Sequence, residues 1–275
     1  MYERVRDLDV RSEDTTAFDL KVDFKVDKVD DAAAGASTGM TRRSALLLHG
    51  FTGTPFEMRF LGEKLAARGV RAVGPRLAGH AGTTDDLAVS TYRDWIAGAD
   101  TALAELKRDS DKVAVVGLSL GGLIALDLAR RNPDLAALVC LSVPLWLPRA
   151  TVVGIRAASI LLRQIPKLGG PDIRDEGTKK GFPSLKDFPL SPLRSLLDLQ
   201  AFIRPRVPAV KLPALIMHAD HDHVAPPACA RELYERLATR DKRLVRLPES
   251  YHIITVDVEK ELVAREVGDF LKERM

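Results

Sequence analysis

The chain has 275 residues, of which 41 are basic and 38 acidic, and its formal net charge at pH 7 is +3. This balance, without a basic stripe interleaved with aromatic residues, argues against a nucleic-acid partner. The length and the hydrophobic content of 46% suit one large α/β domain or two smaller ones with a sizeable core. The charged start has no secretory signal and no apolar run reaches the roughly 20 residues of a membrane span, so we expect a cytoplasmic protein without stable membrane insertion.

The first part of the chain has a β pattern. Residues 18–26 alternate apolar and charged side chains, which predicts a half-buried strand at the edge of a sheet. Residues 4–10 are a candidate for its antiparallel partner, so we expect residues 1–30 to form a leading β-hairpin. The small and polar residues 31–43 predict a flexible loop.

From residue 44 onward, short apolar strands alternate with amphipathic helices. We expect strands at residues 44–48, 70–73, 113–116, 135–143, 215–217 and 244–247. We expect helices at residues 56–69, 92–106, 121–131, 227–237 and 256–271. Because the connections are short, this order predicts an α/β fold with a mainly parallel central sheet and helices on both faces. Ligands of such sheets bind beyond the carboxyl ends of the strands.

One long segment, residues 146–210, interrupts this alternation. It contains many prolines and has helical apolar stretches only at residues 155–165 and 193–203. Since long loops without secondary structure are uncommon, we predict a small helical cap inserted into a core formed by residues 1–145 and 211–275. An additional packing layer is the alternative.

The apolar composition of this segment also predicts a ligand environment. Trp146, Leu147 and Ile155 are candidate lining residues of a hydrophobic acyl pocket. We therefore expect a small-molecule ester with a hydrophobic acyl chain rather than a polar substrate.

A Gly-x-Ser-x-Gly sequence lies at residues 117–121, between an expected strand and an expected helix. This context is typical of a nucleophile elbow, a sharp turn that exposes the hydroxyl of Ser119 above the sheet. Gly117 and Gly121 would permit the close backbone approach that the turn requires. An ordinary glycine-rich turn is the structural alternative.

A serine hydroxyl is a poor nucleophile at neutral pH, so it needs a base and a third group that orients the base. Two later strand ends supply candidates in the chain order Ser, Asp, His. His252 is the candidate base. Asp220 and Asp222 follow the strand at 215–217, and either of them could orient His252.

The remaining histidines have other interpretations. His218, His221 and His223 lie close to two aspartates, a composition that could bind zinc. The spacing does not match that of metallo-hydrolases and no second cluster exists in the sequence, so we expect no metal. A serine, a base and an orienting acid need no cofactor, so we expect none. We interpret His221 and His223 as partly exposed loop residues, and His49 and His80 as residues that hold loops by hydrogen bonds.

These motifs resemble the α/β-hydrolase superfamily and, more narrowly, the bacterial carboxylesterase and monoacylglycerol lipase family. The resemblance lies in residues 46–55 (Leu-Leu-Leu-His-Gly-Phe-Thr-Gly-Thr-Pro), 79–80 (Gly-His), 117–122, 222–226 and 250–257 (Ser-Tyr-His-Ile-Ile-Thr-Val-Asp). These motifs span most of residues 44–145 and 213–272, in the order of the family. The first 43 residues and the predicted cap match the family poorly.

The resemblance implies roles for individual residues. In the family the orienting aspartate lies four residues before a loop proline, as Asp222 does before Pro226, which favours Asp222 over Asp220. Ser119, Asp222 and His252 would then form a catalytic triad. The resemblance also implies an oxyanion hole made by the backbone N–H groups of Phe51 and Leu120.

The implied activity is that of a serine hydrolase that cleaves short- to medium-chain carboxylic esters through an acyl-enzyme. A monoacylglycerol lipase shares these motifs and is the alternative. An acyltransferase or a non-catalytic binding protein on the same fold is a weaker alternative. Epoxide hydrolases and dehalogenases of this superfamily usually carry aspartate where this chain has Ser119, which disfavours both.

Overall fold

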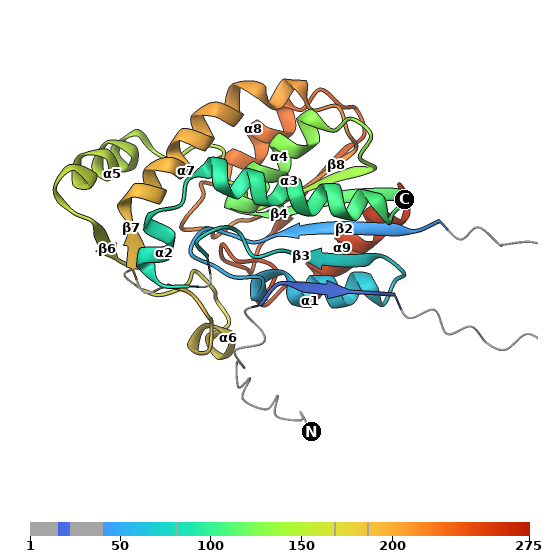
Figure 1. Cartoon of the computed structure of the whole chain (residues 1–275), viewed down its shortest axis with the longest axis horizontal. Helices are drawn as coiled ribbons and strands as arrows, with labels where there is room; N and C mark the ends of the chain where they lie inside the picture. The colour runs from blue at the N-terminus through green and yellow to red at the C-terminus, as the bar shows by residue number, and fades with distance from the viewer. Residues whose placement is uncertain (1–15, 23–40, 81, 168, 186) are drawn as a thin grey trace, which may run out of the picture.

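The computed structural model describes residues 16–22, 41–80, 82–167, 169–185 and 187–275, and a seven-stranded sheet lies at its centre (Figure 1). Its strands, in spatial order, are β1 (Phe18–Leu20), β3 (Arg71–Gly74), β2 (Arg43–Leu48), β4 (Lys112–Leu118), β5 (Ala137–Leu141), β8 (Ala214–Ala219) and β9 (Lys242–Leu247). β1 is antiparallel to β3, and every other neighbouring pair in this sheet is parallel. The predicted α/β class with a mainly parallel sheet is confirmed.

Helices cover both faces of this sheet (Figure 1). On one face lie α3 (Tyr92–Arg108), α4 (Leu120–Arg131) and α8 (Ala228–Arg236). On the other face lie α1 (Phe56–Ala66) and α9 (Lys260–Lys272). Each face has its own apolar cluster. Successive side chains of a strand point to opposite faces, so Val115 of β4 belongs to the first cluster and Val116 to the second.

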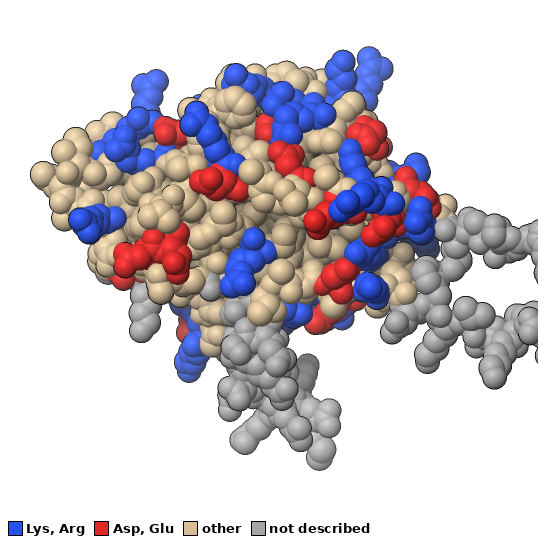
Figure 2. Space-filling model, viewed as in Figure 1, with Lys and Arg blue, Asp and Glu red and all other residues tan. Residues whose placement is uncertain are grey.

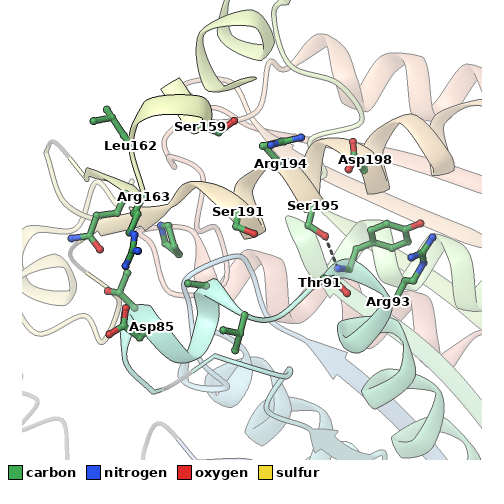
Figure 3. Close-up of a pocket in the computed structure, with 16 residues that line it drawn as sticks. Asp85, Thr91, Arg93, Ser159, Leu162, Arg163, Ser191, Arg194, Ser195 and Asp198 are labelled. Atoms are coloured by element: carbon green, nitrogen blue, oxygen red, sulfur yellow. Dashed lines mark hydrogen bonds between the residues drawn. The ribbon is translucent and has the colours of Figure 1, made fainter. Parts of the chain in front are cut away.

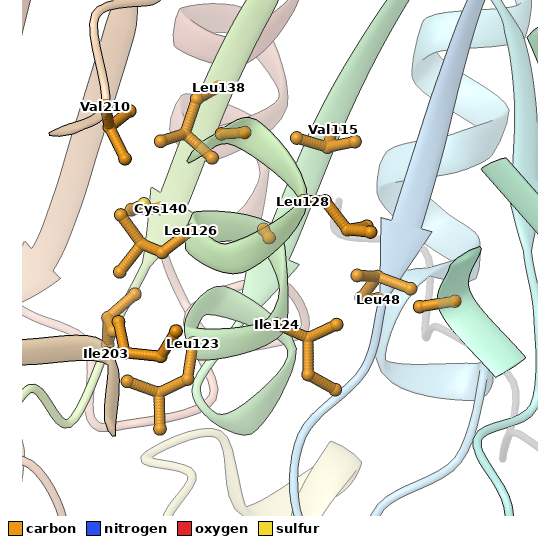
Figure 4. Close-up of a cluster of buried hydrophobic side chains, with 14 of the residues drawn as sticks. Leu48, Val115, Leu123, Ile124, Leu126, Leu128, Leu138, Cys140, Ile203 and Val210 are labelled. Atoms are coloured by element: carbon orange, nitrogen blue, oxygen red, sulfur yellow. The ribbon is translucent and has the colours of Figure 1, made fainter. Parts of the chain in front are cut away.

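The buried helix α4 is the centre of the first cluster. Figure 4 shows Leu123, Ile124, Leu126 and Leu128 projecting from it, with Val115 on the neighbouring strand. Because α4 is buried on nearly all of its residues, the turn that precedes it is set rigidly against β4 and β5.

The segment between β5 and β8, residues 142–213, is called the insertion below. It contains α5 (Arg149–Leu161), β6 (Gln164–Pro166), α6 (Glu176–Lys180), β7 (Asp187–Pro189), α7 (Leu190–Ile203) and the 3-10 helix η2 (Arg204–Ala209). It projects past the end of the sheet toward which the β2 arrow points, together with the short helix α2 (Thr84–Ala88) (Figure 1). The interpretation of residues 146–210 as a cap on a separate core remains a prediction.

The insertion differs in detail from the expected helices. The expected helix at 155–165 begins earlier, at Arg149, and its last residues instead form β6, which pairs antiparallel with β7. Pro166 has no N–H to continue a helix. The pairing of β6 with β7 instead supplies hydrogen-bond partners for the extended backbone around it. The hydrophobic periodicity of 155–165 did not distinguish these two structures.

The leading β-hairpin remains a prediction, and β1 covers only Phe18–Leu20 of the strand expected at residues 18–26. β1 lies at the sheet edge, as the alternating pattern predicted, but its described partner is β3. Residues 1–15 and 23–40, which carry the rest of the predicted hairpin and most of the predicted loop, lie outside the described residues.

The surface carries charges of both signs. On the face shown in Figure 2, basic and acidic side chains are interspersed. None of the helices in the described ranges is both long enough and apolar enough to cross a membrane.

Candidate active site

Ser119 lies in a strained turn between β4 and α4. Its φ is +53°, a region that non-glycine residues rarely adopt. The backbone here is closely packed, because a Cβ on Gly117 would overlap the backbone of Gly121, and a Cβ on Gly121 would overlap the carbonyl of Leu48. The two glycines therefore allow the turn, which matches the geometry predicted for a nucleophile elbow.

The side chain of His252 lies between Ser119 and Asp222. Its Nε2 atom is 2.9 Å from Oγ of Ser119, and its Nδ1 atom is 2.7 Å from Oδ2 of Asp222. An ionised carboxylate can only accept a hydrogen bond, so Nδ1–H donates to Asp222 and leaves Nε2 free to accept the serine proton. All three residues are at most 9% exposed.

Asp222 is held in a dense hydrogen-bond network. Its Oδ1 atom accepts hydrogen bonds from the N–H groups of Val224 and Ala225, at 2.9 and 2.7 Å. Its Oδ2 atom also lies 3.1 Å from Nε2 of His218. Burial alone would raise the pKa of this carboxyl, but the His252 ring and the hydrogen bonds from His218 and His252 hold the pKa well below its ordinary value. Asp222 therefore stays ionised beside His252.

Asp220, the alternative acid, points elsewhere. Its carboxylate pairs with Arg246 of β9 on the partly exposed surface. Between these two aspartates, only Asp222 contacts His252.

The protonation of His252 is shifted by these neighbours. Burial acts to lower its pKa, but the charge of Asp222 and the hydrogen bond to it outweigh burial and raise the pKa above its ordinary value of 6.5. More distant contributions from Asp172 and Glu57 act in the same direction. The imidazole is therefore a stronger base than a free histidine.

The two predicted oxyanion donors lie in the turns that follow β4 and β2. Leu120 is the first residue of α4, so its N–H has no acceptor within the helix. Phe51 lies in the turn after β2, next to Gly50. Gly50 is close to the nucleophile, because a Cβ built on it would lie 3.5 Å from the Cβ of Ser119. The Leu120 amide therefore directly follows Ser119, and Phe51 belongs to the neighbouring turn, so their role as an oxyanion hole stays a prediction.

His49 holds the turn that carries Phe51. Its Nδ1–H donates to the carbonyl of Gly50 at 3.0 Å, and its Nε2 accepts the N–H of Leu77 at 3.1 Å. Burial lowers the pKa of His49 to about 3, so the ring is neutral. His80 donates to the carbonyl of Ala78, and burial lowers its pKa to about 4. Both contacts agree with the loop-holding roles expected for these residues.

A buried carboxyl that the sequence interpretation missed lies next to this turn. Glu57 is 3% exposed, and its Oε2 accepts the N–H of Gly50 at 2.6 Å. Burial raises its pKa to about 7. The signal was present, because Glu57 precedes Leu61 and Leu65 at four-residue spacing and so lies on the buried stripe of α1.

A cavity of about 640 Å³ opens above Ser119 and His252. Much of its apolar lining comes from the insertion: Leu147, Ile155, Ile165, Phe188, Leu193 and Leu196. Glu57, Lys167 and Asp172 add charged groups. The volume suits a small organic molecule.

Trp146 corrects one expectation. It is not among the lining residues of this cavity, whereas Leu147 and Ile155 are. Trp146 packs instead against the buried cluster around α4, and its carbonyl accepts the thiol of Cys229. The apolar composition that suggested a pocket position suits a core position equally well.

A larger and more open hollow of about 1150 Å³ lies apart from these residues, between α2, α5 and α7 (Figure 3). Arg163 and Arg194 line it, and the hydroxyl of Ser195 in its wall accepts the N–H of Tyr92 at 2.7 Å. Neither Ser119 nor His252 borders it, so we assign the chemistry to the smaller cavity.

The insertion is tied directly to the loop that carries His252. Asp172 accepts the N–H groups of His223 and His252, at 3.1 and 3.2 Å. Asp257, on the other side, accepts the N–H groups of Arg174 and Tyr251, at 3.0 and 2.7 Å. These contacts join residues far apart in the sequence, and nothing in the local pattern indicated them.

The histidine-rich loop is arranged as a structural loop. His221 and His223 are exposed, and Nδ1 of His223 lies 2.8 Å from Oδ1 of Asp172. Within the described ranges no group of three or more histidine, cysteine, aspartate or glutamate residues has a geometry that could hold a metal ion.

The sheet order, the turn at Ser119 and the order of the site residues are those of an α/β-hydrolase. Residues 39–259 match the Hydrolase_4 family, described as serine aminopeptidase, S33. The chain therefore belongs to this family of α/β-hydrolases, and the resemblance inferred from the sequence is confirmed.

Curated relatives and solved structures agree with this assignment. A thermostable monoacylglycerol lipase of Bacillus sp. (strain H-257) is 32% identical over 229 residues, covering 82% of this chain and 88% of that protein. A carboxylesterase of Bacillus subtilis (strain 168) is 31% identical over 234 residues, covering 84% and 93%. A solved structure from the description of LipS and LipT, two metagenome-derived lipolytic enzymes, is 28% identical, with a TM-score of 0.83 and coverage of 94% and 98%.

Proposed function

We propose that this chain is a carboxylic ester hydrolase that works through an acyl-enzyme on Ser119. His252 takes the proton of the Ser119 hydroxyl as its Oγ attacks the ester carbonyl carbon. The N–H groups of Phe51 and Leu120 stabilise the resulting oxyanion. The carbon–oxygen bond to the alcohol then breaks as His252 donates its proton to the leaving oxygen.

The second half of the reaction uses the same groups. His252 deprotonates a water molecule, which attacks the acyl carbon on Ser119. Collapse of the second oxyanion releases the carboxylic acid, and Oγ of Ser119 recovers its proton from His252. Throughout, Asp222 stays ionised and stabilises the imidazolium that forms twice in the cycle.

One observation carries this proposal: the contacts of 2.9 and 2.7 Å that link Ser119, His252 and Asp222 at the floor of the cavity. A hydrogen-bonded nucleophile, base and orienting acid is the arrangement that acyl transfer requires. The names of the relatives support an ester as the scissile group, since they include a monoacylglycerol lipase and a carboxylesterase.

We propose short- to medium-chain acyl esters as substrates. Leu147, Ile155 and Leu196 give the cavity an apolar surface suited to an acyl chain. Monoacylglycerols are the second candidate, favoured by the similarity to the Bacillus sp. lipase.

We also propose the cytoplasmic location predicted from the sequence, which cell fractionation would test.

Labelling with a fluorophosphonate probe tests the nucleophile. The wild-type chain should be labelled and hydrolyse p-nitrophenyl esters, and Ser119→Ala should lose both properties. Ser142→Ala is a matched control, because Ser142 also lies buried after a strand of the sheet with a positive φ but does not line the cavity. Persistent labelling of the Ser119→Ala variant would remove Ser119 from its proposed role.

A substrate series tests the chemistry and the chain length. We expect kcat/KM for p-nitrophenyl esters to be highest with short to medium acyl chains. A strong preference for long-chain monoacylglycerols would favour the second candidate. Turnover of aminoacyl p-nitroanilides without turnover of esters would contradict an ester hydrolase altogether.

A further inference from the structure

Gly50 is enclosed between the nucleophile and a buried carboxyl. A Cβ on this glycine would lie 3.1 Å from Oε2 of Glu57 and 3.5 Å from the Cβ of Ser119. A Cβ would therefore crowd the Glu57 carboxyl and contact Ser119 at an ordinary van der Waals distance, which leaves little room for a side chain at the position before Phe51. The cost is that glycine has more backbone freedom than any other residue. The Phe51 N–H therefore depends on other groups to hold the peptide that presents it.

The contacts of Gly50 supply this restraint from both sides. Its carbonyl accepts the Nδ1–H of His49 at 3.0 Å and the N–H of Gly53 at 3.3 Å. Its own N–H donates to Oε2 of Glu57 at 2.6 Å. The Glu57 carboxyl also fills the space beside Gly53, where a Cβ would overlap it. Glu57 is thus packed against both glycines of the turn.

The turn is strained, so it requires such contacts. Thr52 has a φ of +60°, uncommon for a residue with a branched side chain. Two residues of the insertion contact Thr52. Nζ of Lys167 lies 3.4 Å from Oγ1 of Thr52, and the N–H of Leu185 donates to the carbonyl of Thr52 at 3.3 Å. Glu57 holds the opposite side of the same turn.

We propose that Glu57 is a positioning residue for the oxyanion hole, which acts by fixing Gly50 so that the Phe51 N–H faces the developing oxyanion. This role rests on the proposed function, because it presumes that Ser119 acylates. The charged groups that face the Glu57 carboxyl are Lys167 from the insertion and His252 from the loop after β9. A buried carboxyl lowers the stability of the fold unless it is hydrogen-bonded. The hydrogen bond from the Gly50 N–H compensates part of this cost and restrains the turn.

Three variants of Glu57 separate its contributions. Glu57→Gln keeps an oxygen that can accept the Gly50 N–H and removes the ionisable group. Glu57→Met keeps the length of the side chain and removes the acceptor. Glu57→Asp keeps the ionisable carboxyl but is one methylene too short to reach Gly50. Glu63→Met is the control, because Glu63 is an exposed residue on the same helix.

The measurements are kcat and KM for a p-nitrophenyl ester, and the affinity for a trifluoromethyl ketone that forms a tetrahedral oxyanion adduct with a serine. We expect Glu57→Met and Glu57→Asp to lower kcat by about 10- to 100-fold, below the loss for a whole oxyanion donor. KM should change less than threefold, and ketone affinity should fall by the factor lost in kcat/KM. Glu57→Gln and Glu63→Met should stay within threefold of wild type.

Two results would overturn the role of Glu57. One is a kcat within twofold of wild type in both Glu57→Met and Glu57→Asp. The other is a loss confined to KM with unchanged ketone affinity, which would place Glu57 in ground-state binding. Circular dichroism identifies a variant that has not folded, and Glu57→Asp is the more conservative of the two. Because Ser119→Ala tests the nucleophile separately, an active enzyme that is indifferent to Glu57 refutes this inference alone.

Discussion

The Nε2 atom of His252 lies 2.9 Å from Oγ of Ser119, although 133 residues separate them in the chain. They meet because the loop after β9 and the turn after β4 both lie at the carboxyl ends of parallel strands. Because Asp222 contacts this histidine and Asp220 does not, substitution of each aspartate tests which of them orients His252.

Asp222→Asn should lower kcat by about 10⁴-fold, because an amide cannot hold the imidazole in the required tautomer or stabilise its charge. Asp220→Asn should change kcat less than threefold, since it removes only the partly exposed pair with Arg246. Steady-state kinetics on one ester substrate compares the two variants. Equal losses in both would show that the 2.7 Å contact of Asp222 with His252 does not govern the reaction.

The pH dependence of kcat/KM should report the protonation of His252. The base must be neutral to accept the Ser119 proton, so activity should rise with pH. Because the charge of Asp222 raises the pKa of His252, the midpoint should lie above the ordinary value of 6.5. In Asp222→Asn the midpoint of the residual activity should move to lower pH. A wild-type midpoint below 6.5 would contradict the assignment of His252 as the base.

The site residues differ in how far the sequence could predict them. Ser119 lies in a local motif, and its strand–turn–helix context is readable from the sequence. The choice of Asp222 over Asp220 came from the family resemblance, because both follow the same strand. Glu57 was readable in principle as an acidic residue on an apolar stripe of α1, but nothing in the local pattern places its carboxyl beside Gly50.

Other features depend on contacts that no local pattern records. Asp172 belongs to the insertion, and its partners, the N–H groups of His223 and His252, lie 51 and 80 residues away. The strands were predictable because burial on both faces leaves continuous apolar runs. The ribbon of β6 and β7 was not, because it consists of two three-residue strands whose pairing depends on long-range contacts.

Asp172→Ala should lower kcat by about 10- to 100-fold, because this carboxylate accepts backbone N–H groups from both the His223 and the His252 loops. Small displacements of a catalytic group are costly in this range. Asp198→Ala is the matched control, since Asp198 is also in the insertion, and its ion pair among the described residues is with Arg156 on the surface. If Asp172→Ala retains wild-type kcat, the contacts of Asp172 with the His223 and His252 amides do not govern the position of His252.

Glu57→Gln should change how stability depends on pH. The pKa of Glu57 is raised from 4.5 to about 7 in the folded chain, so the folded state keeps a proton that the unfolded state releases. Wild-type stability should therefore fall, relative to the variant, as pH rises from 4.5 to 7 and then level off. The difference in unfolding free energy between pH 4.5 and 8 should be up to about 3 kcal/mol. Urea unfolding at several pH values measures it, and a difference independent of pH would contradict the raised pKa.

Gly121→Ala should destabilise the fold by at least about 3 kcal/mol, because its Cβ would overlap the backbone carbonyl of Leu48 and neither strand nor helix can move without disturbing the core. Gly154→Ala is the matched control in another helix. A Cβ there meets no atom within 4 Å among the described residues, so alanine should stabilise α5 by about 0.5–1 kcal/mol. Thermal unfolding of both variants decides the point. If Gly121→Ala unfolds at the wild-type temperature and retains activity, the tight approach of α4 to β2 is not what shapes the turn at Ser119.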